Sequence, residues 1–158
     1  RAAVDQGPEA GRVLPRDSVR VAGARPGLTI SDLALGIRAA SVRWQPSPAD
    51  TVLLTPFDLF LAGSEVELYY EAAGVVPGGR YRHEIGVYRV RRDDRPEERP
   101  AVSLQVDEVA TDSVIRTHRV LQLARLKPGT YVVGVSLTGP AGETDRRRRA
   151  IRVIEVER

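Results

Sequence analysis

Residues 126–137 constrain the fold of this chain more than any other segment. Pro128 fixes its own backbone φ angle, and Gly129 can adopt a turn conformation that other residues resist. Tyr131 then opens a stretch in which apolar side chains alternate, so that one face of an extended strand carries Val133, Val135 and Leu137. The segment therefore predicts a turn that leads into a core strand of a β-sheet.

A tyrosine at this place is typical of the tyrosine corner of Ig-like sandwiches, where the hydroxyl bonds to nearby upstream backbone. The remaining sequence agrees, because short alternating segments follow one another with turn signals roughly every 8–12 residues. We therefore predict an all-β fold, a single Ig-like or fibronectin-like antiparallel β-sandwich of roughly seven to nine strands. The expected strands lie at 28–37, 52–61, 65–72, 81–91, 102–106, 114–126, 131–137 and 150–156.

Three local features refine this expectation. A change of apolar phase at Ser31 and Asp32 predicts a β-bulge. Pro56 cannot donate to a sheet ladder, so residues 52–61 form an edge strand or two short strands. Trp44, the single tryptophan, lies in an expected loop and is predicted to be a buried plug at the end of the sandwich rather than a platform for a sugar.

Charged and aromatic side chains alternate with apolar ones on two of the expected strands. The arginines of strand 81–91 are expected to face the glutamates of strand 65–72, as an ion-paired cross-strand contact. Tyr69 and Tyr88 are expected to point outward from these strands.

Residues 1–27 differ from the rest of the chain. They contain three prolines and four glycines without a sustained apolar period, which predicts an extended or disordered arm before a sandwich domain of residues 28–158. We expect the arm to be loose in isolation and to become ordered against another subunit. Its candidate partner-binding residues are Val13, Leu14, Val19 and Val21.

Composition excludes several kinds of chemistry. The chain has no cysteine, which rules out disulfides, thiolate metal sites and cysteine nucleophiles. No apolar run approaches the roughly 20 residues of a membrane-spanning helix. Methionine is absent even at position 1, so we expect a processed end or a fragment, and a removed signal peptide would explain it. The net charge of +3 and the aromatic content of 5% do not favour nucleic-acid binding.

The sequence contains no pattern that predicts catalytic, cofactor-binding or metal-binding residues. His83 and His118 do not share a zinc-ligand spacing. The glycines at 78 and 79 lack the lysine of a phosphate-binding loop and predict a turn. Arginines surround the acidic residues of loop 92–100, which favours a solvated loop over a calcium site.

Arg146, Arg147, Arg148 and Arg149 form the single run of like charges. If they enter the last strand, alternate arginines point to opposite faces. One interpretation is an edge strand that charge protects against aggregation. The other is a grip on an anionic partner, in the order acidic protein surface, lipid headgroup, nucleic acid.

The motifs at residues 30–33, 66–71 and 126–131 together resemble the C-terminal β-sandwich part of bacterial GWxTD-domain proteins. That family shows a Ser-Asp-Leu strand, then a Tyr-Tyr/Phe-Glu strand, and a Leu-x-Pro-Gly-x-Tyr strand last but one. The Gly-Trp-x-Thr-Asp motif itself is not in this chain. The resemblance implies an exported bacterial protein without an established catalytic activity.

These observations predict a non-enzymatic, periplasmic or cell-surface module that binds a protein partner, as an accessory or structural subunit of a larger, possibly membrane-embedded assembly. The alternative is a carbohydrate-binding or other noncatalytic domain of a longer exported enzyme, with Tyr69 and Tyr88 as an aromatic platform. Neither the partner nor the oligomeric state follows from the sequence.

Overall fold

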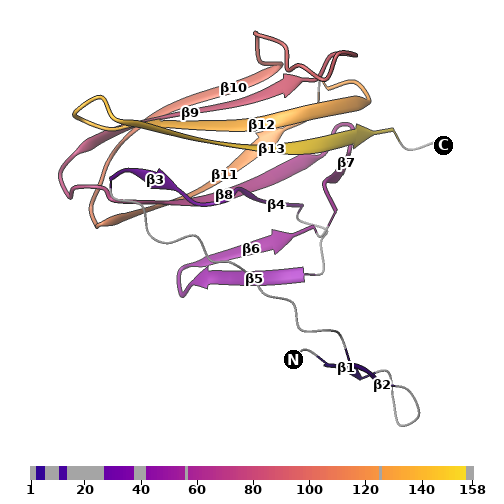
Figure 1. Cartoon of the computed structure of the whole chain (residues 1–158), viewed down its shortest axis with the longest axis horizontal. Coiled ribbons are helices and arrows are strands. Elements are labelled where there is room, and N and C mark those ends of the chain that lie inside the picture. The colour runs from indigo at the N-terminus through magenta and orange to yellow at the C-terminus, as the bar shows by residue number, and fades with distance from the viewer. Residues whose placement is uncertain are drawn as a thin grey trace.

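The described residues fold into two main β-sheets without any helix (Figure 1). This computed structural model describes residues 3–5, 11–13, 27–37, 42–55, 57–124 and 126–155. The five-stranded sheet has the order β10–β9–β12–β13–β7, formed by β7 (Leu59–Leu61), β9 (Arg80–Arg89), β10 (Val102–Val109), β12 (Gly129–Thr138) and β13 (Thr144–Ile154). The six-stranded sheet has the order β11–β8–β4–β6–β5, with β3 also paired to β8. Its strands are β3 (Thr29–Ile30), β4 (Ala34–Gly36), β5 (Val42–Ser47), β6 (Asp50–Leu54), β8 (Glu65–Ala73) and β11 (Val114–Gln122).

The two sheets share one apolar core, which makes the fold sandwich-like. Inward residues of β8 and β11 pack in the same buried cluster as those of β9, β12 and β13. The expected inward residues are buried as predicted, with Leu68 and Val133 both at 0% exposure. The largest fully buried side chains are aromatic: Tyr69, Tyr70, Tyr81, Tyr131 and Phe60.

The turn-and-strand prediction around Tyr131 is confirmed. Tyr131 lies near the start of β12, the middle strand of its sheet, and its side chain is 2% exposed. Its hydroxyl donates a 2.8 Å hydrogen bond to the Lys127 carbonyl. Gly129 has a φ angle of 154°, a conformation that glycine adopts more readily than other residues.

The predicted irregularity at Ser31 and Asp32 is also present. Ile30 pairs with Ala72 of β8, and Ala34 pairs with Tyr69. Residues 31, 32 and 33 therefore lie opposite residues 70 and 71, so one strand carries one extra residue, as in a β-bulge. The same irregularity divides the expected strand into β3 and β4.

Residues 42–54 form a hairpin, β5–β6, where the sequence predicted a loop and then a strand. Its backbone lies so close to Gly36 that a Cβ there would collide with the Leu53 carbonyl. The hairpin covers part of the outward side of β8, because Tyr69 is 1% and Glu67 is 7% exposed. The prediction for Trp44 is wrong: it stands on β5 with 40% of its surface exposed, since the short hairpin leaves one side of the ring uncovered.

The expected ion pairing between strands 65–72 and 81–91 is wrong. The two strands follow each other in sequence but belong to different sheets, β8 to the six-stranded and β9 to the five-stranded one. Arg82 of β9 instead pairs with Asp107 of β10 at 3.0 Å, and that hydrogen bond lowers the pKa of Asp107. Arg116 of β11 takes the place beside Glu71.

Residues 52–61 contain two short strands, β6 and β7, as one of the two alternatives predicted. They go to opposite sheets, and β7 runs parallel to β13. The two sheets contain more strands than expected, because β4 separates from β3 and β5 was not predicted.

The N-terminal segment is described only in part. Ala3–Asp5 (β1) and Gly11–Val13 (β2) pair as an antiparallel ladder, which the expectation of an extended arm did not include. Within the described residues, the fold contains no helix long and apolar enough to cross a bilayer.

Candidate functional site

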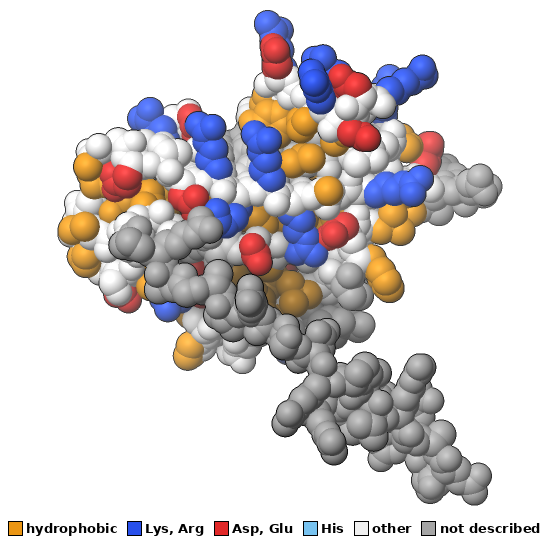
Figure 2. All heavy atoms as spheres, viewed as in Figure 1, with side chains coloured by type: hydrophobic (Ala, Val, Ile, Leu, Met, Phe, Trp, Pro, Cys, Tyr) orange, Lys and Arg blue, Asp and Glu red, His pale blue; other side chains and the backbone are white. Residues whose placement is uncertain are grey.

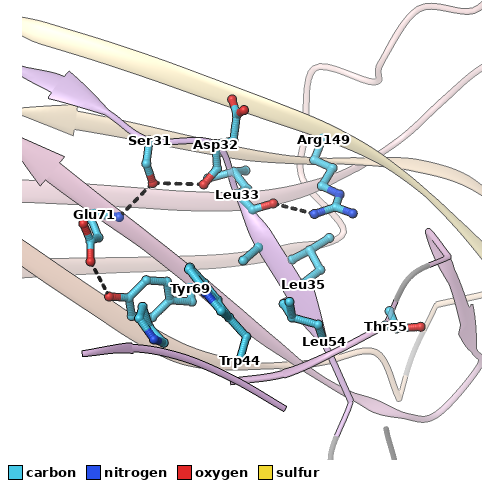
Figure 3. Close-up of a pocket in the computed structure, with 12 residues that line it drawn as sticks. Ser31, Asp32, Leu33, Leu35, Trp44, Leu54, Thr55, Tyr69, Glu71 and Arg149 are labelled. Carbon is cyan, nitrogen blue, oxygen red and sulfur yellow. Dashed lines mark hydrogen bonds between the residues drawn. The ribbon is translucent and has the colours of Figure 1, made fainter. Parts of the chain in front are cut away.

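A cleft of about 680 Å³ lies between the β5–β6 hairpin and the segment that joins β3 to β4 (Figure 3). Its volume is within the range of ordinary ligand-binding pockets. Most of its lining is apolar, and Trp44 stands beside it. The lining side chains that the argument uses are Leu33, Leu35, Trp44, Leu54, Tyr69 and Arg149.

Most polar groups of the cleft are already bonded within the protein. The Tyr69 hydroxyl donates to Glu71 Oε1 at 2.7 Å, and the Glu71 amide donates to Ser31 Oγ at 3.0 Å. The guanidinium of Arg149 donates to the Leu33 carbonyl at 2.6 Å and pairs with Asp58 at 2.7 Å. Few of these groups are left to bind a polar ligand, whereas the Trp44 ring beside them is 40% exposed.

Trp44 and Tyr69 meet edge to face, with ring centroids 5.5 Å apart and planes at 88°. Such an arrangement is favourable for aromatic rings and holds the indole in place. Burial, together with the hydrogen bond to Glu71, raises the pKa of Tyr69, so its hydroxyl keeps its proton. The exposed indole is therefore a firmly held apolar surface at the cleft.

The expected tyrosine platform does not form. Tyr69 is buried in the six-stranded sheet, while Tyr88 lies on β9 of the five-stranded sheet. Rings on different sheets, one of them covered, cannot present one flat surface to a sugar.

The four-arginine run divides into two pairs on opposite faces of β13, as the alternation predicted. Arg147 and Arg149 point toward the six-stranded sheet. Arg147 pairs with Asp145 of its own strand at 3.1 Å, and Arg149 pairs with Asp58, which directly precedes β7. Arg147 also donates to the Arg146 carbonyl at 2.9 Å. Arg147 and Arg149 lie on the part of β13 that β7 does not pair, and charged side chains there favour the edge-protecting interpretation for this pair.

Asp145 binds the two sheets together near the same edge. One of its oxygens accepts a 2.7 Å hydrogen bond from the Ile30 amide. Burial raises the pKa of this carboxyl, but the backbone amides of Ile30 and Arg146 and the Arg147 guanidinium outweigh it and hold the pKa below its usual value.

Arg146 and Arg148 face outward on the other side of β13, and both are exposed. Within the described part of the chain, neither has a carboxylate within ion-pair distance. These two are the members of the run that remain available to a partner.

The histidines have separate structural environments. His83 is 1% exposed, and its Nδ1 shares a 2.7 Å hydrogen bond with the Tyr70 hydroxyl. Burial and the nearby Arg119 lower the pKa of His83 to about 4. His118 lies on β11, with its Nε2 3.5 Å from Glu67. The residues that the structure describes include no group of three or more side chains arranged to hold a metal ion.

Of the candidate arm residues, Val13 ends β2, and Leu14, Val19 and Val21 lie outside the described residues. The acidic loop is present at 91–101, where Val90 bridges to Pro96. The turn predicted at 77–79 is present as well.

Sequence reasoning missed the cleft itself. The sequence pattern predicts a bulged strand for Asp32, Leu33 and Leu35, and nothing in it indicates that the β5–β6 hairpin stands beside them. One available signal was Trp44 followed by Pro46 in a short hairpin, a combination that leaves a large ring with little chain to cover it.

No family model matches this chain, and no curated protein matches it either. Among solved structures it is similar to the crystal structure of the PmoD soluble domain from Methylocystis sp. ATCC 49242 (Rockwell). The identity is 12% and the TM-score 0.40, over 79% of this chain and 90% of that one.

Proposed function

We propose that this protein is a noncatalytic module that binds a protein partner through the Trp44 cleft. The observation that carries the proposal is the contrast inside the cleft. Most of its polar groups are bonded within the protein, whereas the Trp44 indole at its side is 40% exposed. An apolar side chain of a partner fills such a site without leaving a buried polar group unpaired.

We infer that the protein that binds in this way is an exported accessory subunit and that its fold is an Ig-like sandwich. The Tyr131 hydrogen bond to Lys127 supports the Ig-like assignment. The location in the periplasm or at the cell surface, and the docking on a larger bacterial assembly, rest on the resemblance to GWxTD-domain proteins. The arm of residues 1–27 remains a second candidate contact.

A carbohydrate-binding domain is the second candidate, because Trp44 is an exposed aromatic ring with the carboxylate of Asp32 nearby in the cleft. Sugars stack on such rings but also need several free hydrogen-bonding groups. The bonded state of Glu71, Ser31 and Arg149 makes the cleft a poor match for sugar hydroxyls.

The proposal is tested by copurification from the native source with tagged wild-type protein and two variants. Trp44→Ala removes the apolar surface of the cleft. Phe57→Ala is the matched control, since Phe57 is 72% exposed and does not line the cleft. We expect one stoichiometric protein that is lost with Trp44→Ala and kept with Phe57→Ala. Retention by the Trp44 variant, or a partner lost only with Phe57→Ala, would refute the cleft as the docking site.

A further inference from the structure

The outer face of the five-stranded sheet contains a second hollow, away from the Trp44 cleft. It occupies about 250 Å³, and its lining is mainly polar. Glu84, Tyr88, Ser136, Arg146 and Arg148 surround it. The inference drawn from it does not depend on the cleft.

Two glycines that face each other across β9 and β12 create this hollow. Gly86 pairs with Gly134, and Gly134 pairs in turn with Arg148 of β13. The Tyr88 ring lies over the glycines, because a Cβ at Gly86 would be 2.6 Å from a ring carbon and one at Gly134 would be 3.4 Å from it. The sheet therefore presents a depression with an aromatic wall, where other residues would fill the surface.

The charges around the hollow have a definite order. Ser136 stands between Glu84 and Arg146 in one row across the sheet, and Arg148 stands beside Gly134 in the next. On the far side of Tyr88, Arg148 also lines a second hollow of about 360 Å³ together with Glu97 and Glu98. Arginines thus predominate around the first hollow, glutamates predominate around the second, and the Tyr88 ring lines both.

From this arrangement we propose that the outer face of the five-stranded sheet binds an extended peptide segment with both an acidic and a basic side chain. The acidic side chain would lie between Arg146 and Arg148, and the peptide would cross the Tyr88 ring. The basic side chain would then reach Glu97 and Glu98. Tyr88 stands in the same row across the sheet as Ala150, four residues along β13 from Arg146 and thus roughly 13 Å away. Glu97 is bonded to Arg89, the residue after Tyr88. The two charges of the peptide should therefore be about four residues apart.

Polyanions fit this face less well than a peptide does. A nucleic acid or an anionic bilayer needs a continuous positive surface, whereas Glu84, Glu97 and Glu98 interrupt the arginines here. Basic and acidic side chains are also interspersed on the face of the molecule seen in Figure 2. A short segment of mixed charge matches such a surface, because opposite charges across an interface give specificity.

The test uses the isotope-labelled full chain and a capped extended peptide with Glu and Lys four residues apart. We expect saturable NMR shifts at the Gly134 and Ser136 amides, with a dissociation constant in the range of about 0.1–1 mM. Arg146→Gln and Arg148→Gln should each weaken binding about two- to fivefold, and the double variant about tenfold. Arg152→Gln is the matched control, because Arg152 is exposed on the same strand and lines neither hollow.

A second variant tests the shape of the hollow rather than its charge. Gly134→Ala introduces a methyl group at a tolerable 3.4 Å from Tyr88, so the sheet should fold while the floor of the hollow rises and binding weakens. The proposal fails if the peptide produces no saturable shifts up to about 5 mM. It also fails if the version with Gln in place of Glu binds equally well, if Arg152→Gln weakens binding as much as Arg148→Gln, or if phosphatidylglycerol vesicles shift these amides while the peptide does not.

Discussion

The stability of this domain should depend on pH through one buried histidine. His83 is 1% exposed, and burial and Arg119 lower its pKa from 6.5 to about 4. The unfolded chain therefore binds one more proton than the folded protein between these two pH values. Stability is fully present above pH 6.5 and falls as the pH is lowered toward 4.

The magnitude follows from the width of this pH window. Each pH unit with one extra proton in the unfolded state costs about 1.4 kcal/mol, so the full window costs about 3 kcal/mol. Glu108 opposes the effect, since its carboxylate lies 3.6 Å from His83 Nε2 and Asp107 acts in the same sense. Because the Glu108 side chain is 34% exposed, solvent screens it, and burial of the ring dominates.

The measurement is chemical denaturation at several pH values from 7 to 4.5, at constant ionic strength. Wild type should lose most of this stability, whereas His83→Gln should change by less than about 1 kcal/mol. Asp107 and Asp145 have lowered pKa values, so the stability that they contribute is present above about pH 3.8 and is lost only below it. That loss lies outside the measured range. A wild-type stability that stays flat down to pH 4.5, or falls equally in the His83 variant, would refute the reasoning.

Three further predictions concern the stability of the fold. Tyr131→Phe should lower the free energy of unfolding by about 1–2 kcal/mol, because the Lys127 carbonyl loses its donor, and an unchanged denaturation midpoint would contradict this. Arg149→Gln should cost about 1–2 kcal/mol through its bonds to Leu33 and Asp58, while Arg148→Gln should change stability by less than about 0.5 kcal/mol. A metal chelator should leave the thermal unfolding curve unchanged, and a large drop in melting temperature would show that an ion stabilises the fold.

The period-two pattern of the sequence predicts which face of a strand is buried, and here it does so reliably for β9 and β12. It does not predict which strand pairs with which, because the same alternation fits any partner. For this reason the sequence predicts that the arginines of β9 face the glutamates of β8, although the two strands belong to different sheets. The same limit applies to Tyr69, which alternates as a solvent-facing residue but is covered by the β5–β6 hairpin.

The candidate sites illustrate the same point. The sequence indicates the four-arginine run and its alternation. It does not indicate that Arg147 pairs with Asp145 and Arg149 with Asp58. Asp58 is 91 residues from Arg149 in the chain and meets it only in the folded protein, whereas Asp145 lies two residues before Arg147 on the same strand. Gly86 and Gly134 read as unremarkable glycines within strands, and only the register between β9 and β12 reveals that they face each other.

Fluorescence of Trp44 tests the central claim most directly, since it is the single tryptophan of the chain. Its emission and its quenching by acrylamide should be measured on the purified protein, alone and with the partner that copurifies in a Trp44-dependent manner. The partner alone gives the background from its own tryptophans. If the cleft is the docking site, the Trp44 signal should shift to shorter wavelength and become less accessible to acrylamide when the complex forms. An unchanged Trp44 signal in a complex that has formed would contradict the account.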